Sequence, residues 1–198
     1  MIKVLLFDID GVTSKYKRLS YLNYLSKLTG KSHEDLVKVG SPLIRRFDAG
    51  GLTLREFEKQ AAKLLGIKEK EVRWREFYAP DTALNRPLVG MIKRLHKNYK
   101  TACLTNMDRS RYIYTKKFLY EVAFDRRFIS SYLGMAKPDP RLYSRVLQRL
   151  NVNPSEVIFV DDNERNIISA NKMGIKTIWF RNNAQLKKDL FKLLDISR

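Results

Sequence analysis

The chain has 198 residues, of which 44% are hydrophobic, 30% charged and 11% aromatic, which suits one α/β domain or a core with a modest insertion. No run approaches the ~18 apolar residues of a membrane span, which excludes a spanning helix. The net charge of +18 invites a nucleic-acid function, because basic surfaces bind phosphate backbones. Lys and Arg are nevertheless spread along the chain without a basic tail or block, and this favours a solvated basic surface.

Two features predict a cytoplasmic protein that is not bound to a membrane. The N-terminal apolar run is short and ends at Asp8, unlike a secretory signal. Cys103 is the only cysteine, so no disulfide forms within the chain, which suits a reducing compartment. Because Cys103 lies inside a predicted strand, we expect it to be a small buried hydrophobic residue.

The first predicted element is a buried strand near the N-terminus. Residues 4–7 are apolar without alternation, which is typical of a parallel strand covered on both faces. Gly11 breaks the strand, so Asp8 and Asp10 follow its carboxyl end, the edge of an open α/β sheet where ligands bind. Residues two apart in an extended segment point the same way, so both carboxylates are expected in one cleft.

The next part of the chain is predicted to be a helical insertion. Leucines recur at helical spacing, glycines mark the expected helix ends, and no convincing strand pattern is present. The helices are expected at residues 19–29, 53–65 and 69–78. The predicted domains are a core of residues 1–14 and 83–198 and an inserted helical cap of residues 15–82.

After the insertion, helical and strand patterns alternate to the end of the chain. Helices are predicted over residues 87–97, 110–122, 140–150, 164–173 and 185–194, and strands over residues 101–104, 128–130, 157–160 and 176–180. Asp108 is the expected N-cap of the second of these helices. Strands that alternate with helices form parallel sheets with right-handed crossovers, so the predicted fold class is α/β with a mostly parallel sheet.

Polar residues follow three of the apolar strands, and a loop between the second and third supplies a lysine. These residues are Asp8 and Asp10, Thr105 and Asn106, Asp161 and Asp162, and Lys137. Each pair alone has an ordinary explanation as a turn or helix cap, but together they are expected to meet at one edge of a parallel sheet. Four carboxylates in one cleft repel unless a proton or cation relieves them, and an all-oxygen set favours Mg²⁺. Thr105 and Lys137 then face an anion, which predicts a phosphoryl-transfer site.

The same residues resemble the four motifs of the haloacid dehalogenase-like hydrolase superfamily. The matching segments are Asp8-Ile-Asp10-Gly-Val, Thr105-Asn106, Lys137-Pro-Asp-Pro and Asp161-Asp162-x-x-x-Asn166. They occur in the order found in the superfamily, and the helical insertion after the first motif is similar to its small α-helical cap. The resemblance implies a Rossmann-like core, dependence on Mg²⁺ and a covalent aspartyl-phosphate.

The resemblance also implies a role for each catalytic residue. Asp8 would attack phosphorus in line, and Asp10 would protonate the leaving oxygen and then take a proton from water. Thr105 and Asn106 would donate hydrogen bonds to the phosphoryl oxygens. Lys137 would neutralise those oxygens and Asp8.

For the metal, the resemblance implies a site at the acidic strand ends. Mg²⁺ would lie between the carboxylate of Asp8, the main-chain carbonyl of Asp10, and Asp161 or Asp162. Asn166 would tether the segment that carries the last two acids, or be a solvated helix residue.

Several alternatives remain open at this point. Dehalogenases of the superfamily, by resemblance, lack the second acid, so Asp10 favours cleavage of a phosphate ester; a phosphomutase is a further alternative. The basic charge leaves open a phosphatase of nucleic-acid ends, or a nucleic-acid-binding protein with a vestigial site. The favoured substrate is a small phosphorylated metabolite, and the sequence does not indicate an oligomeric state. Cap residues that could reach the leaving group, although packing or solvation is favoured for each, are Tyr16, Lys17, Arg18, Tyr21, Arg45, Arg46 and Trp74.

Overall fold

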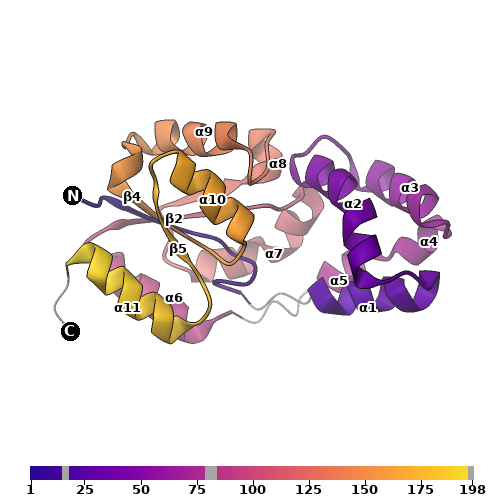
Figure 1. Cartoon of the computed structure of the whole chain (residues 1–198), viewed down its shortest axis with the longest axis horizontal. Coiled ribbons are helices and arrows are strands. Elements are labelled where there is room, and N and C mark those ends of the chain that lie inside the picture. Colours follow the sequence, from indigo (N-terminus) through magenta and orange to yellow (C-terminus); the bar gives the residue numbers. More distant parts are fainter. Residues whose placement is uncertain (15–17, 79–83, 196–198) are drawn as a thin grey trace.

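A five-stranded parallel sheet forms the centre of the larger part of the protein (Figure 1). The computed structural model describes residues 1–14, 18–78 and 84–195. The strands are β1 (Val4–Phe7), β2 (Lys100–Thr105), β3 (Arg126–Ile129), β4 (Val157–Asp161) and β5 (Lys176–Trp179), in the order β3-β2-β1-β4-β5. All four neighbouring pairs are parallel, which confirms the predicted α/β fold.

Helices cover both faces of the sheet. One face carries α6 (Arg86–Leu95), α7 (Arg109–Glu121) and α11 (Asn183–Leu194), and the other carries α8 (Ser130–Leu133), α9 (Pro140–Leu150) and α10 (Glu164–Lys172) (Figure 1). Leu5 and Phe7 pack into the first layer, whereas Val4 and Leu6 pack into the second. Because neighbouring side chains of a strand point to opposite faces, β1 needs an unbroken apolar sequence to serve both layers.

The register places the predicted site residues at one edge of the sheet. Phe7 of β1 pairs with Cys103 of β2 and with Val160 of β4. The residues just beyond these positions therefore leave the sheet side by side. The backbone N–H of Asp8 continues the ladder by donating to the carbonyl of Val160 at 2.8 Å.

A helical unit, which we call the cap, lies beside the sheet (Figure 1). It consists of α1 (Arg18–Thr29), α2 (His33–Asp48), α3 (Leu54–Leu65), α4 (Glu69–Val72) and α5 (Trp74–Tyr78), and no strand occurs among its described residues, 18–78. Its helices share an apolar cluster in which the stacked rings of Phe47 and Phe57 meet Trp74. The segments that join the cap to the sheet include residues 15–17 and 79–83, so the predicted domain boundaries at 14/15 and 82/83 border undescribed residues.

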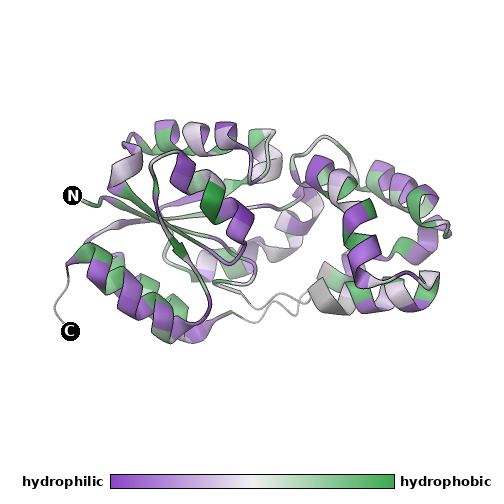
Figure 2. Ribbon diagram, viewed as in Figure 1, coloured by the Kyte–Doolittle hydropathy of each residue, from purple (hydrophilic) through white to green (hydrophobic). Residues whose placement is uncertain are grey.

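Local sequence signals explain several helix ends. Thr53 and Glu56 form a capping box at the start of α3, and Gly66 ends that helix in the left-handed conformation. Asp108 caps α7 as predicted, its side chain accepting a hydrogen bond from the backbone N–H of Arg111. Hydrophobic and hydrophilic residues follow one another along the helices of both the core and the cap, as the colours of Figure 2 show. Among the described residues, no helix combines the length and apolar character needed to cross a membrane.

Two features of the cap differ from the sequence prediction. Helix α2 was not predicted, because Gly40 and Pro42 lie inside it and interrupt the helical pattern. The single helix expected over residues 69–78 is instead two short helices, separated by Arg73 in the left-handed conformation.

Candidate active site

The carboxyl ends of β1, β2 and β4 bring the predicted polar residues together. They meet at a cavity of about 620 Å³ whose walls come from both the core and the cap. The predicted residues that line it are Asp8, Asp10, Thr105, Asn106, Lys137, Asp162 and Asn166. Asp161 is fully buried and does not line the cavity. Residues up to 158 positions apart in the chain therefore form one site because parallel strands end at the same edge.

Lys137 is the buried cation at the centre of this site. Its Nζ lies 2.8 Å from Oδ1 of Asp8 and 2.7 Å from Oδ2 of Asp161. Burial disfavours the charged ammonium, but Asp161 and Asp8 outweigh it and raise the pKa of Lys137 above its usual value. Lys137 is therefore charged at neutral pH.

The four acids of the site outnumber the two cations, Lys137 and Arg111, that are paired with them. Burial raises the pKa of Asp8 well above its ordinary value; Lys137 opposes this shift, whereas Asp161 and Asp10 add to it. Desolvation of the Asp162 carboxylate by the surrounding cavity wall, with Asp161 adding to it, also raises the pKa of Asp162 to about 6. A further cation bound in the site would therefore reduce the repulsion between these carboxylates.

Three of these acids are placed to hold that cation. One carboxylate oxygen from each of Asp8, Asp161 and Asp162 lies within 4.8 Å of the others. An all-oxygen set of this kind suits a hard divalent ion such as Mg²⁺. The carboxylate of Asp10 lies outside this cluster, so the residues present fit a metal held without the Asp10 side chain.

Asp161 is held by its surroundings in a way that Asp162 is not. Nδ2 of Asn166 lies 3.0 and 3.1 Å from the two carboxylate oxygens of Asp161, and the backbone N–H of Asn163 donates to Oδ1 at 2.8 Å. Asn166 thus tethers this segment, one of the two roles considered from the sequence. The surface of Asp162 is exposed where it lines the cavity, and among the described residues no other residue donates a hydrogen bond to its carboxylate.

The side chain of Thr105 carries a hydroxyl group that is still able to form a hydrogen bond with a ligand. Its hydroxyl is buried and has no hydrogen-bond partner among the residues that the structure describes. A buried hydroxyl without a partner costs free energy, about 1–3 kcal/mol, unless a ligand supplies the missing bond. The unpartnered hydroxyl of Thr105 therefore indicates that a ligand supplies a hydrogen-bond acceptor at this position.

Asn106 organises the loop that carries Lys137. Its Oδ1 accepts from the backbone N–H of Lys137 at 2.8 Å, and its Nδ2 donates to the carbonyl of Lys137 at 2.9 Å. An amide nitrogen carries two hydrogens, so one remains for a ligand.

Arg111 was not predicted, yet it is the partner of Asp10. Its Nη2 lies 2.5 Å from Oδ1 of Asp10, and the Arg111 side chain is only 7% exposed. Ser14 donates to the same oxygen at 3.4 Å. Nothing in the sequence distinguishes Arg111 from the other basic residues of α7, since only the tertiary structure brings that helix to the carboxyl end of β1.

Asp48, at the end of α2, is a second site residue that the sequence did not reveal. It lines the cavity from the cap, and burial raises its pKa to about 7, with Asp108 adding to the shift. Its carbonyl accepts a hydrogen bond from Ser130 of the core at 2.5 Å. Nε1 of Trp74 donates to Asp108 at 3.3 Å, so cap and core are joined next to the cavity.

The cap residues that the sequence suggested as contacts of the leaving group lie in different places in the structure. Tyr21 and Trp74 are buried in the cap cluster, which agrees with the packing role favoured for them, although Trp74 also borders the cavity. Arg45 lines the cavity, whereas Arg46 does not. Tyr16, Lys17 and the side chain of Arg18 lie outside the described residues.

Gly11 is required by its backbone and by its closeness to Asp162. Its φ is +79°, and a Cβ there would lie 2.0 Å from Oδ2 of Asp162. We expect Gly11→Ala to displace Asp162 and to weaken Mg²⁺ binding by about 10- to 100-fold, in the range seen when supports of metal ligands are lost. The left-handed conformation itself adds about 1–2 kcal/mol of destabilisation.

Gly30→Ala is the matched control for that variant. Gly30 has a similar φ of +70°, but nothing lies within 4 Å of its would-be Cβ. Calorimetric titration with Mg²⁺ and thermal unfolding should show a stability loss in both variants but weaker Mg²⁺ binding only in Gly11→Ala. Equal Mg²⁺ affinity in the two would show that Gly11 does not serve the acidic cluster.

The fold and this site together define a class of protein. A parallel sheet that gathers acids, a lysine and an unpartnered hydroxyl at the carboxyl ends of its central strands is an α/β protein that binds its ligand at that edge. The family model described as haloacid dehalogenase-like hydrolase matches residues 2–174. The chain belongs to this family of hydrolases.

Comparisons with individual proteins agree with this family. The chain is 27% identical over 209 residues to D-ribitol-5-phosphate phosphatase of Bacteroides thetaiotaomicron, covering 98% of this chain and 100% of that protein. It is 33% identical over 117 residues to bifunctional epoxide hydrolase 2 of Rattus norvegicus, covering 56% of this chain but only 21% of that much longer protein. A family enzyme of Bacteroides thetaiotaomicron, solved with magnesium and inorganic phosphate, shares the fold with a TM-score of 0.72 at 21% identity, covering 91% of this chain and 95% of that one.

Proposed function

We propose that this hydrolase is a Mg²⁺-dependent phosphatase of small phosphomonoesters that works through an aspartyl-phosphate on Asp8. The observation that carries the proposal is the buried, unpartnered hydroxyl of Thr105, which shares a cavity with the Asp8–Lys137 ion pair. A nucleophile, a cation and a free donor are the parts that transfer of a phosphoryl group requires.

In the proposed reaction the carboxylate of Asp8 attacks phosphorus, and the bond from phosphorus to the leaving oxygen breaks. Asp10 gives its proton to that oxygen, then takes one from the water that attacks the aspartyl-phosphate and regenerates Asp8. Lys137 and the hydroxyl of Thr105 stabilise charge on the phosphoryl oxygens. Arg111 pairs with the Asp10 carboxylate outside the cluster of Asp8, Asp161 and Asp162, and so orients the group that transfers the proton.

The acidic cluster would hold Mg²⁺ through Asp8, Asp162 and the main-chain carbonyl of Asp10, with Asp161 behind them. We favour Asp162 over Asp161 as the direct ligand, because both oxygens of Asp161 already accept hydrogen bonds. When bound, the ion would neutralise phosphoryl oxygens and keep Asp8 ionised. The magnesium and inorganic phosphate bound by the structurally similar enzyme support Mg²⁺ as the ion and a phosphate group as the ligand.

Asp10 also separates the proposed phosphatase from a dehalogenase. A halide leaves without a proton, so a dehalogenase needs no second acid, whereas an alkoxide needs one. The D-ribitol-5-phosphate phosphatase, similar over nearly the whole chain, supports a small phosphorylated metabolite as substrate. We also propose that residues 15–82 form the cap domain and that the protein is cytoplasmic.

The test is a screen of phosphorylated metabolites and of oligonucleotides with terminal phosphates, with and without Mg²⁺. We expect metabolites to release inorganic phosphate only with Mg²⁺, and a chelator to stop the reaction until Mg²⁺ is restored. Turnover of oligonucleotides alone would favour a nucleic-acid phosphatase. Salt-sensitive oligonucleotide binding without any turnover would favour a binding protein and contradict the proposal.

A further inference from the structure

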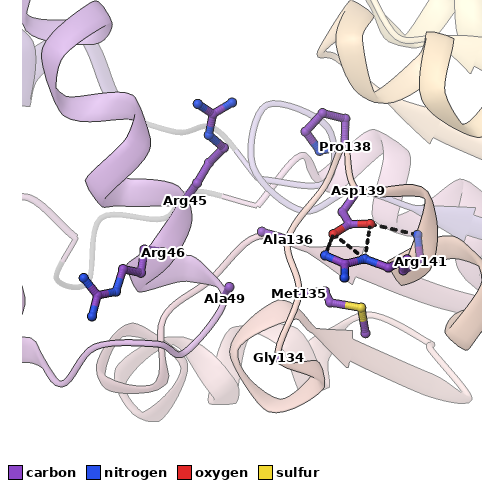
Figure 3. A pocket seen from close by; sticks show the side chains of 9 residues that line it. All are labelled: Arg45, Arg46, Ala49, Gly134, Met135, Ala136, Pro138, Asp139 and Arg141. Carbon is purple, nitrogen blue, oxygen red and sulfur yellow. Dashed lines mark hydrogen bonds and ion pairs between the residues drawn. The ribbon is translucent and has the colours of Figure 1, made fainter.

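A second, basic pocket lies beside the catalytic cavity, and we call it the outer pocket. Arg45, Arg46 and Ala49 form its cap side, and residues 134–136, 138, 139 and 141 of the core form the other side (Figure 3). Its volume is about 470 Å³, and both Arg45 and Pro138 line this pocket and the catalytic cavity. Since Pro138 directly follows Lys137, the outer pocket adjoins the site assigned to the transferred phosphoryl group.

Arg45 is the cation that borders both spaces. Its side chain is exposed, and among the residues that the structure describes it has no hydrogen bond or ion pair. Arg141, across the outer pocket, is instead held by Asp139, with Nη2 2.6 Å from Oδ2 (Figure 3). An arginine without an acidic partner is suited to bind a carboxylate or phosphate on a ligand through two parallel hydrogen bonds.

The position of Arg45 on α2 gives it a special role among the cap residues. Arg45 is the one cation that the described part of the cap contributes to the catalytic cavity, and Figure 3 shows the neighbouring Arg46 pointing in another direction. Asp48 lies one helical turn away but forms no ion pair with Arg45 among the residues that the structure describes, and burial raises the pKa of Asp48 to about 7. Arg45 therefore keeps its attraction for an anion.

We propose that Arg45 is a specificity-determining residue that selects phosphomonoesters whose leaving group carries a second anionic group, either a carboxylate or another phosphate. The inference rests on the proposed phosphatase function and names the substrate class of the same site. The transferred phosphoryl group would lie at Lys137 and Thr105, and the second anion would lie beside Arg45 at the entrance of the outer pocket. A neutral leaving group would make no use of this arginine.

The test compares substrates that differ only in the second anion. The wild-type enzyme should prefer 3-phosphoglycerate to glycerol 3-phosphate about tenfold or more in kcat/KM, as expected for one added charge-assisted contact. A second pair, fructose 1,6-bisphosphate and fructose 6-phosphate, distinguishes a phosphate from a carboxylate. Arg45→Ala should reduce the preference about tenfold within the preferred pair.

Arg55→Ala is the matched control, because Arg55 is exposed on α3 and lines neither cavity. It removes the same charge from the molecule, so a preference that came only from the net charge of +18 would fall equally in both variants and overturn the proposal. No preference in the wild type, or one that Arg45→Ala retains, would also overturn it. Failure to hydrolyse even p-nitrophenyl phosphate with Mg²⁺ would instead remove the phosphatase function, and this inference with it.

Discussion

Asp8→Asn is expected to reduce phosphate release on the order of 10⁴-fold or more, the largest effect of any single substitution considered, because it removes the nucleophile. The amide matches the carboxylate in shape, so the cavity should keep its form. Burial already disfavours the charge of Asp8, so the variant should remain folded. Inorganic phosphate release and thermal unfolding measure the two effects separately.

Asp35→Asn provides the matched control for this substitution. Asp35 is an exposed residue of α2 that does not line the catalytic cavity, and the same chemical change there should leave turnover unaltered. Acid quenching during turnover, followed by mass measurement, should detect phosphate bound to the wild-type chain and none on Asp8→Asn. Full activity of Asp8→Asn would rule out the covalent mechanism.

Lys137→Met should produce the largest loss of stability. Lys137 lies between Asp8 and Asp161, and its removal leaves buried negative charge without its cation. Breaking a buried ion pair from one side costs about 3–5 kcal/mol. In a chain of this size that lowers the unfolding temperature by about 10 °C. Phosphate release should also fall at least about 100-fold, because the phosphoryl oxygens lose their cation.

The pH dependence of that loss provides a further check. Without Lys137, the pKa of Asp8 in the folded state lies even further above its unfolded value, so the folded state binds the extra proton. The stability deficit should therefore shrink as the pH falls towards the folded pKa and be largest at neutral and higher pH. Lys188→Met, at an exposed position of α11, is the control and should change neither stability nor its pH dependence. A Lys137→Met protein as stable as wild type at pH 7 would contradict the assigned charge balance.

The core of the fold was predictable because its signals are local. The unbroken apolar runs at 4–7 and 157–160 became the central strands β1 and β4, since a strand covered on both faces has no polar positions. Asp108 was recognisable as an N-cap because its side chain bonds to a backbone group three residues away. By contrast α2 contains Gly40 and Pro42, which interrupt the helical pattern although Ser32 caps its start, and packing of Leu36 and Phe47 in the cap maintains the helix.

In the candidate site, too, some residues were predictable from the sequence and others were not. Asp8, Thr105 and Asp161 could be found from the sequence because each stands at the end of an apolar strand, and parallel strands end at a common edge. Arg111 and Asp48 could not be found, because each stands among other charged residues on a helix and acquires its partners only through folding.

The sequence by itself determined the α/β class, the family motifs and the residues that gather at the sheet edge, since periodicity and strand ends are properties of neighbouring residues. Only the tertiary structure decided which of these residues are already bound to one another and which are left for a ligand. It ties Asp10 to Arg111 and Asn106 to the Lys137 loop, and leaves the hydroxyl of Thr105 without a partner. Burial and hydrogen bonding depend on contacts between distant segments, and these exist only once the chain has folded.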